Sequence, residues 1–281
     1  MTSWEFPADG PIEARISLPA GSVTLTAAPT ETVTVSLTPT HTLTGAKDAE
    51  RLIGETEVSF EGGRLSVEVP KRLHIRGNAS LDLTIALPGG STVDANIASA
   101  DLRGTVELAG LRVHAASGDV TVEKITGQAD LTTASGDVRL EWVTGDIRIK
   151  TASGDVNVGS AEGDIKTTTA SGDVRIGQAR QWVQSKTASG DIRIDAIAEG
   201  RAEATSVSGD ISVAVPPGTD VYLDLSSLSG RVRSDLDAAG SGQPGGEPGL
   251  ALTCNTVSGD IRVSRGGDSI RVGRGGETEP R

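Results

Sequence analysis

Residues 116–140 read ASGDVTVEKITGQADLTTASGDVRL and contain two copies of the string Ala-Ser-Gly-Asp-Val. The same string, with Val or Ile after the Asp, recurs along the middle of the chain at a spacing of 18 residues. Its aspartates are Asp119, Asp137, Asp155, Asp173 and Asp191. A fixed period of this length is typical of repeat proteins, in which each copy forms one unit that stacks on the next.

Weaker copies of the string extend the pattern in both directions. Upstream, Asp101 keeps the 18-residue spacing, with Ala100 in place of the Gly. Downstream the spacing grows: Asp210 comes 19 residues after the preceding aspartate, Arg231 stands in the Asp position 21 residues later, and Asp260 follows after a further 29. We expect this drift to spoil the surface on which another molecule could stack at the downstream end.

Each 18-residue period divides into two halves, because glycines recur every nine residues. After the Asp, apolar and polar residues alternate, as in Val138, Arg139 and Leu140, which is the period of a β-strand. The Gly suits a tight turn that needs a positive φ. Each half is therefore a short strand and a turn, and coils of two strands should stack in parallel about 4.8 Å apart. The sequence predicts an all-β fold, a parallel β-solenoid (β-helix) of 18-residue double-strand coils.

The flanking regions lack the repeat but still favour strands. We predict that residues 1–97 form an N-terminal β-strand region that caps the solenoid, with one short helix at Ala46–Ile53. The solenoid itself should span residues 98–263, with a Gly- and Pro-rich loop excursion at 235–249, and residues 264–281 should form a disordered tail. The strands expected in the first region are Ile12–Leu18, Val23–Ala27, Thr32–Thr38, Arg64–Val69 and Leu81–Leu87.

Composition narrows the classes of function. The formal net charge of −12 disfavours binding to nucleic acid, since a phosphate backbone would be repelled. The single cysteine, Cys254, excludes an intrachain disulfide. No apolar run of signal-peptide or membrane-helix length is present, so we expect a cytoplasmic protein without a membrane segment. No cofactor is expected.

Three sets of residues together resemble a known bacterial family. They are the S-G-D-[VI]-x-[VI] repeats, the turns at Leu18–Ser22, Leu87–Ser91 and Val215–Thr219, and the segment from Leu223 to Asp237. In this combination the chain is similar, over roughly residues 10–265, to a putative-adhesin family of β-strand-repeat proteins of unknown function. The resemblance implies a β-solenoid. Its adhesin label implies surface binding, and it supplies no catalytic residues.

The repeated aspartates are the first candidate set. We interpret them as a structural turn ladder whose side chains bond turn amides and pair with the arginine two residues further on. Calcium-binding nonapeptide repeats have paired glycines and a different register between Asp and the apolar residue, so we expect no metal here. The predicted ladder consists of Asp101, Asp119, Asp137, Asp155, Asp173, Asp191, Asp210 and Asp260.

The second candidate set is a possible binding face made of Arg139, Trp142, Arg175, Trp182 and Arg193. Charges that repeat coil by coil do not resemble a unique catalytic cluster, so the sequence favours a non-enzyme. The leading hypothesis is a scaffold or interaction module that binds a protein partner in the cytoplasm. Two alternatives stay open: a surface adhesin that binds a polymer or glycan, and a self-polymerising cytoskeletal element. Because both ends of the solenoid look covered, we expect a monomer or small oligomer.

Overall fold

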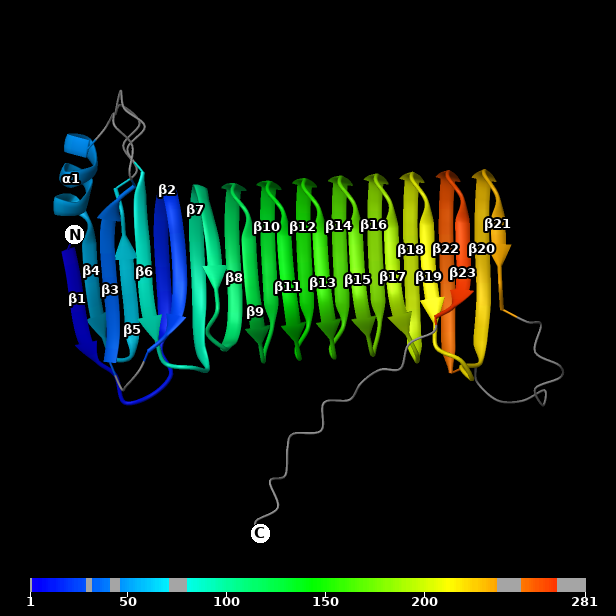
Figure 1. The fold of residues 1–281 in the computed structure, drawn as a ribbon, viewed down its shortest axis with the longest axis horizontal. Coiled ribbons are helices and arrows are strands. Elements are labelled where there is room, and N and C mark those ends of the chain that lie inside the picture. The colour runs from blue at the N-terminus through cyan, green and yellow to red at the C-terminus, as the bar shows by residue number, and fades with distance from the viewer. Residues whose placement is uncertain (1, 29–31, 41–45, 71–79, 237–248, 267–281) are drawn as a thin grey trace, which may run out of the picture.

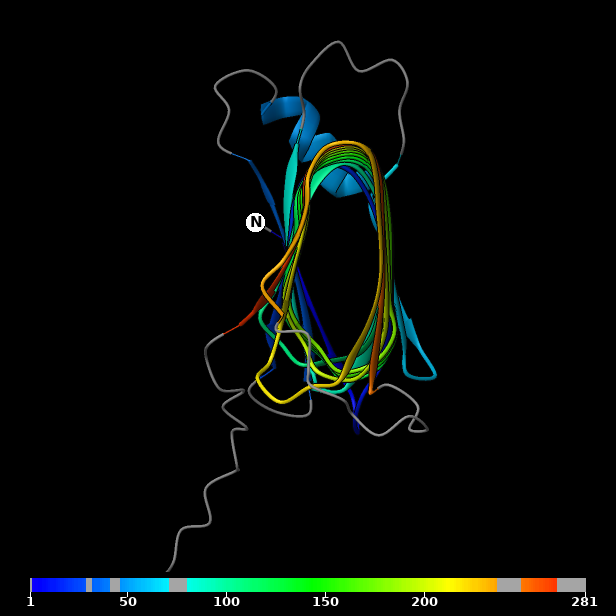
Figure 2. The same ribbon diagram turned by 90° about the vertical axis from the view of Figure 1, so that its right-hand side faces the viewer.

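The computed structural model of the chain describes residues 2–28, 32–40, 46–70, 80–236 and 249–266. The strands stack side by side along one long axis (Figure 1). Seen along that axis, the successive coils superpose as a flattened ring (Figure 2). The predicted parallel β-solenoid is confirmed.

Each regular coil contributes one strand to each long side of the ring. Strands on one side pair in parallel with a shift of one repeat, as in Thr133 opposite Thr151, and those on the other side do the same, as in Val138 opposite Val156. One side consists of β8 (Leu108–Ser117), β10 (Ala129–Ser135), β12 (Ile147–Ser153), β14 (Ile165–Ser171) and β16 (Val183–Ser189). The other consists of β9 (Val120–Ile125), β11 (Val138–Val143), β13 (Val156–Ala161), β15 (Val174–Ala179) and β17 (Ile192–Ile197).

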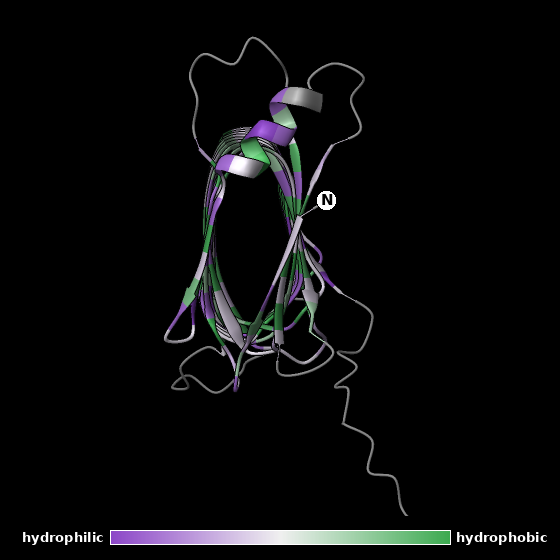
Figure 3. Cartoon of the chain, turned by 90° about the vertical axis from the view of Figure 1, so that its left-hand side faces the viewer, coloured by the Kyte–Doolittle hydropathy of each residue, from purple (hydrophilic) through white to green (hydrophobic). Residues whose placement is uncertain are grey.

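The core runs through the inside of the ring. Inward positions hold Val, Ile, Leu, Ala and Thr, and the apolar side chains among them are almost completely buried, whereas the intervening positions are exposed. Hydrophobic and hydrophilic residues accordingly alternate along the strands (Figure 3). Two of the inward polar residues pair with each other: Thr167 donates a hydrogen bond to Ser185 across 2.9 Å, and neither side chain is exposed. Pairing the two hydroxyls inside the core satisfies groups that would be costly to bury alone.

The N-terminal region continues the stack and then changes character. The strand β2 (Glu13–Ala27) pairs in parallel with β7 (Ser91–Gly104), so parallel stacking runs across residue 97. β2 joins the two strands expected at Ile12–Leu18 and Val23–Ala27, because the turn at Gly21 bends the chain within one continuous ladder. The other elements here are β1 (Thr2–Pro7), β3 (Thr32–Pro39), α1 (Ala46–Glu55), β4 (Glu57–Glu61), β5 (Arg64–Glu68) and β6 (Leu81–Leu87).

Antiparallel pairs mark this end of the solenoid. β1 pairs with β3, β3 with β6, and β4 with β5, all antiparallel. The expected helix is present as α1, and it buries Ala49, Leu52 and Ile53. Figure 1 places α1 at the left-hand end, above the antiparallel strands. The end therefore differs in structure from a regular coil.

The last two coils are stacked in the reverse of their sequence order. β18 (Gly200–Ser208) and β19 (Ile211–Val215) pair directly with β22 (Leu250–Ser258) and β23 (Ile261–Arg265). β20 (Val221–Ser229) and β21 (Val232–Ser234) pair with the outer edges of β22 and β23 (Figure 1). The growing spacing reflects this change of order, and Ser208, Ser258 and Ser229 stay in register.

Two predicted segments lie largely outside the described residues. They are residues 237–248 of the expected loop excursion and residues 267–281 of the expected tail.

Candidate functional site

The repeated aspartates form a hydrogen-bonded ladder along one edge of the ring. In each step, the backbone N–H of one ladder position donates to Oδ1 of the aspartate in the preceding coil, across 2.7–2.9 Å. In stacking order the acceptors are Asp101, Asp119, Asp137, Asp155, Asp173, Asp191, Asp210 and Asp260, and the last donor is Arg231. Each N–H that a carboxylate accepts offsets part of the repulsion between like charges stacked about 5 Å apart.

A glycine precedes every ladder residue except Asp101, which follows Ala100, and this glycine makes the close stacking possible. Gly136 has a φ of 138°, and a Cβ there would lie 2.2 Å from the carbonyl oxygen of Gly118. Any side chain would therefore push adjacent coils apart at the turn. The Gly-Asp pair serves as one unit: the glycine admits the turn, and the aspartate accepts the N–H of the next coil.

The arginines of the repeat do not take the ion-pair partners expected from the sequence. Arg175 contacts Oδ2 of Asp195 at 2.7 Å, and Arg193 contacts the other carboxylate oxygen of the same residue. Partial burial raises the pKa of the Asp195 carboxyl, but the hydrogen bonds from Arg193 and Arg175 outweigh it and hold that pKa below its ordinary value. The sequence-based pairing is wrong because the ladder carboxylates lie in the turn and bond backbone N–H groups instead.

Four of the five predicted binding residues share one surface, which we call the arginine face: the outer surface of β9, β11, β13, β15 and β17. Strand register places Arg139 in one row with Arg175 and Arg193, with Asn157 between the first two. The same row continues through Thr121 to Arg103 of β7, which the sequence analysis missed although it lies two residues after Asp101. Trp142 lies on the same face, in a neighbouring row.

Trp182 lies elsewhere, at the opposite edge of the ring from the aspartate ladder. It occupies the turn before β16, where its backbone N–H donates to Oδ1 of Asp164 across 3.3 Å. Asp164 in turn donates its N–H to Oδ1 of Asp146 across 3.1 Å. Trp182 is therefore the last position of a short second ladder. Its half-buried side chain does not join Trp142 on the arginine face.

Trp142 is the most prominent apolar side chain on the arginine face. It is 42% exposed, and its strand neighbours in register are Lys124 and Ser160. Lys124 is held by Glu107 through an ion pair of 2.6 Å. Arg139, three residues before Trp142, is exposed and forms no ion pair within the described residues. An exposed indole and a guanidinium without an ion pair in the described structure therefore lie three residues apart on β11.

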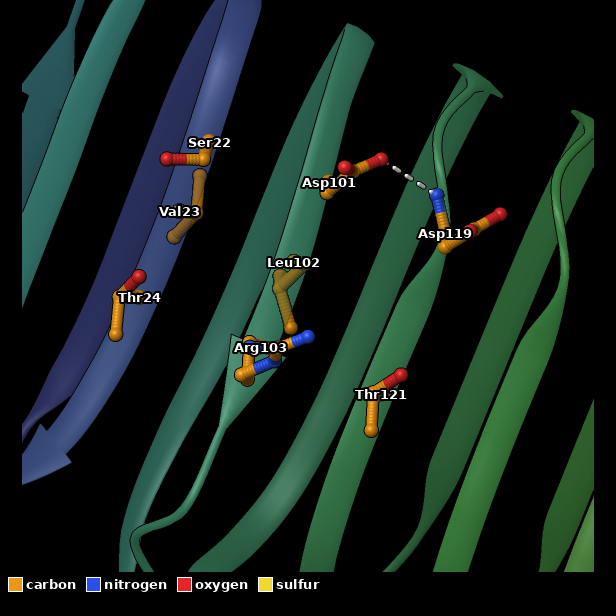
Figure 4. Close-up of a pocket in the computed structure, with 8 residues that line it drawn as sticks. All are labelled: Ser22, Val23, Thr24, Asp101, Leu102, Arg103, Asp119 and Thr121. Carbon is orange, nitrogen blue, oxygen red and sulfur yellow. Dashed lines mark hydrogen bonds between the residues drawn. The ribbon is translucent and has the colours of Figure 1, made fainter.

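A hollow of about 290 Å³ opens at the upstream end of the arginine face. Its lining comes from β2, β7, β9 and the turn before β9, and includes Thr24, Asp101, Arg103, Asp119 and Thr121. Figure 4 shows the first ladder bond, from the N–H of Asp119 to Asp101, crossing this lining. The side chains around it are mostly polar, which extends the polar character of the face to its upstream end.

Cys254 lies on β22, and its side chain is fully buried in the core inside the ring. Burial, with the nearby charge of Asp224, raises the pKa of its thiol to about 12.

In the part of the chain that the structure describes, no group of three or more His, Cys, Asp and Glu side chains could hold a metal ion. No described helix has both the length and the apolar character needed to span a membrane.

The family model Toastrack DUF4097 matches residues 14–264, which include every coil described above. The chain belongs to the Toastrack DUF4097 family. This agrees with the all-β repeat fold and with the resemblance seen in the sequence. The family is of unknown function and is not a known enzyme family. No curated protein matches the chain.

Several solved structures match over most of the chain. A putative adhesin from Bacteroides fragilis is 13% identical, with a TM-score of 0.47, and the match covers 93% of this Toastrack chain and 96% of the other. A putative adhesin from Parabacteroides distasonis is 10% identical, with a TM-score of 0.37 and the same two coverages. A putative lipid binding protein from the same species is 11% identical, with a TM-score of 0.39, again covering 93% and 96%.

Proposed function

We propose that this Toastrack protein is a non-catalytic scaffold that binds a protein partner on the arginine face. The observation that carries the proposal is the exposure of Trp142 on a regular sheet, three residues from Arg139, which forms no ion pair in the described structure. Tryptophan and arginine are the residue types most enriched among those that dominate binding energy at protein interfaces.

The surroundings of Trp142 suit this role. Its neighbour in register, Ser160, is small and half-buried, and Gly159 precedes it, so a partner side chain has room beside the indole. Ser160 and Gly159 lie on β13, which is paired with β11 on one edge and with β15 on the other. The backbone here is therefore fixed before binding, and little conformational entropy is lost when a partner binds. Arg175 and Arg193 already share Asp195, which leaves Arg139 as the arginine of β11, β15 and β17 without an ion pair in the described structure.

The non-catalytic part of the proposal is supported by repetition. The polar residues of the face recur in the same row of successive coils, whereas catalysis needs a unique cluster of groups around one reacting bond. A cytoplasmic location remains part of the proposal, and fractionation of the native host tests it. Recovery on the cell surface would favour the adhesin alternative.

Affinity capture from the native host, with matched variants, tests the proposal. Trp142→Ala and Arg139→Ala should each reduce recovery of the same partner by about tenfold or more, as expected for a residue that dominates an interface. Arg148→Ala is the matched control, because Arg148 is an exposed arginine on β12, on the opposite side of the ring. Unchanged capture by both face variants, or equal loss with Arg148→Ala, would contradict the proposal.

A further inference from the structure

Among the described residues, the terminal coil of the stack has one unpaired edge. β20 pairs with β22 and β21 pairs with β23, and neither has a second strand partner in the described part of the chain. Figure 1 places this coil at the right-hand end of the solenoid. Unpaired strand edges of this kind are prone to pair with another chain.

The apolar side chains of β20 are less covered than those of the coil beside it. Val221, Leu223 and Leu225 are each only half-buried. Their neighbours in register on β22, which are Leu250, Leu252 and Cys254, are 0% exposed. On the outer side of the same strand, Tyr222 is 59% and Leu228 83% exposed. The end coil therefore presents an apolar strand on both of its sides.

The sequence of the segment that joins this coil to β22 contains no large apolar residue after Leu236. Residues 237–248 read DAAGSGQPGGEP, with no Val, Leu, Ile, Met or aromatic residue. Downstream of β23 the sequence contains only Ile270 and Val272 as large apolar residues, which favours another molecule as the source of an apolar cover.

Head-to-tail addition of another copy is disfavoured by the ladder and by the opposite end. Each internal coil offers an aspartate Oδ1 to the N–H of the next coil. The terminal coil carries Arg231 at this position, and an arginine side chain contains no hydrogen-bond acceptor atom. The other end of the solenoid consists of antiparallel pairs such as β1 with β3, and not of a parallel coil. A second copy that meets the same edge about a two-fold axis needs neither of these features.

We propose that two copies of this chain associate end to end, with β20 of one copy antiparallel to β20 of the other and Leu225 on the two-fold axis. In this register Tyr222 lies opposite Leu228 of the second copy, so the most exposed apolar side chains cover each other. Asp224 lies opposite Ser226, which keeps the two Asp224 carboxylates from facing each other directly. Because the contact uses the same surface twice, the assembly closes as a dimer and does not extend into a filament.

Analytical ultracentrifugation of the full chain at about 100 µM tests the assembly, and a dimer without larger species is the expected result. Leu228→Glu should weaken dimerisation by about tenfold or more, since it places a charge in the apolar contact. Val207→Glu is the matched control, because Val207 is 53% exposed and stands at the same position of a coil that has neighbours on both sides. A monomeric wild-type protein, a ladder of larger species, or equal weakening by both variants would overturn the proposal.

Cysteine cross-linking tests the register in a Cys254→Ala background. Leu225→Cys should form a covalent dimer on oxidation, because the residue lies opposite itself. Tyr222→Cys should not, since the two-fold axis places its own copy several residues away. A covalent dimer from Tyr222→Cys and none from Leu225→Cys would overturn the register.

A chain ending at Gly266 should dimerise like the full chain. Dimerisation only after this truncation would show that the C-terminal residues cover the edge, and the proposal would fail.

Discussion

The backbone N–H of Arg231 donates to Oδ1 of Asp260 across 2.8 Å, although Asp260 comes 29 residues later in the sequence. The coil that contains Asp260 is therefore inserted between the coils of Asp210 and Arg231. The position that departs from aspartate is also the position where the described ladder ends. An acceptor is needed only where another coil follows, so arginine at this position removes no hydrogen bond between the described coils.

Removing an internal acceptor should weaken the stack. Asp155→Ala leaves the N–H of Asp173 without its 2.8 Å acceptor, and we expect the free energy of unfolding to fall by about 1 kcal/mol. Asp155→Asn keeps an acceptor oxygen and should cost less. Arg231→Ala is the control at the end of the ladder and should change stability by less than about 0.5 kcal/mol. Urea denaturation measures all three, and equal losses at residues 155 and 231 would count against the ladder.

Neighbouring positions on one strand should respond oppositely to the same new charge. Val156 is 1% exposed inside the ring, whereas Asn157 points outward on the arginine face. Val156→Asp should destabilise the protein by several kcal/mol, because it buries an unpaired carboxylate, and Asn157→Asp should stay within about 0.5 kcal/mol. Thermal melting of the two variants decides the matter. If both lose soluble protein equally, the inward register is wrong.

The buried hydroxyl pair should behave as a unit. Thr167→Val leaves the hydroxyl of Ser185 without its partner in the core and should cost about 1–3 kcal/mol. The double variant Thr167→Val with Ser185→Ala removes both hydroxyls and should be less destabilised than the sum of the two single variants. A double-mutant cycle by chemical denaturation gives the coupling free energy. A value of zero would mean that the two hydroxyls act independently.

Calcium should not be needed for folding. One carboxylate oxygen of each ladder aspartate already accepts a backbone N–H, as in the 2.9 Å bond from Asp155 to Asp137. The melting temperature should therefore be the same with calcium and with a chelator. A fall of about ten degrees on chelation would correspond to several kcal/mol of linked binding and would defeat this prediction.

The sequence predicts the regular coils well because one pattern specifies both the strand and the turn. It predicts the order of the last coils poorly, because the residues that make two coils stack are the same in every coil. Ser208, Ser229 and Ser258 occupy equivalent positions, and nothing near them indicates which coil follows which. Only Arg231 departs from the pattern, and its meaning is clear once the stacking order is known.

The candidate face was predictable for a related reason. An 18-residue period places Arg139, Arg175 and Arg193 in one row whatever the details of the turns. Trp182 follows a turn, and counting positions along the repeat does not reveal that it ends a second ladder instead of joining Trp142. Asp195 is a partner that the repeat could not supply, because the corresponding positions in the two preceding coils are Gly159 and Gly177.

The most direct test of the proposed function is site-specific photo-crosslinking in the native host. A photoreactive residue at position 160, beside Trp142 on the arginine face, should give one discrete adduct with a partner protein, and Trp142→Ala should abolish it. The same residue at position 168, exposed on β14 on the opposite side of the ring, should give no such adduct. An adduct from position 168 alone, or one from position 160 that survives Trp142→Ala, would contradict the assignment of the arginine face as the binding surface.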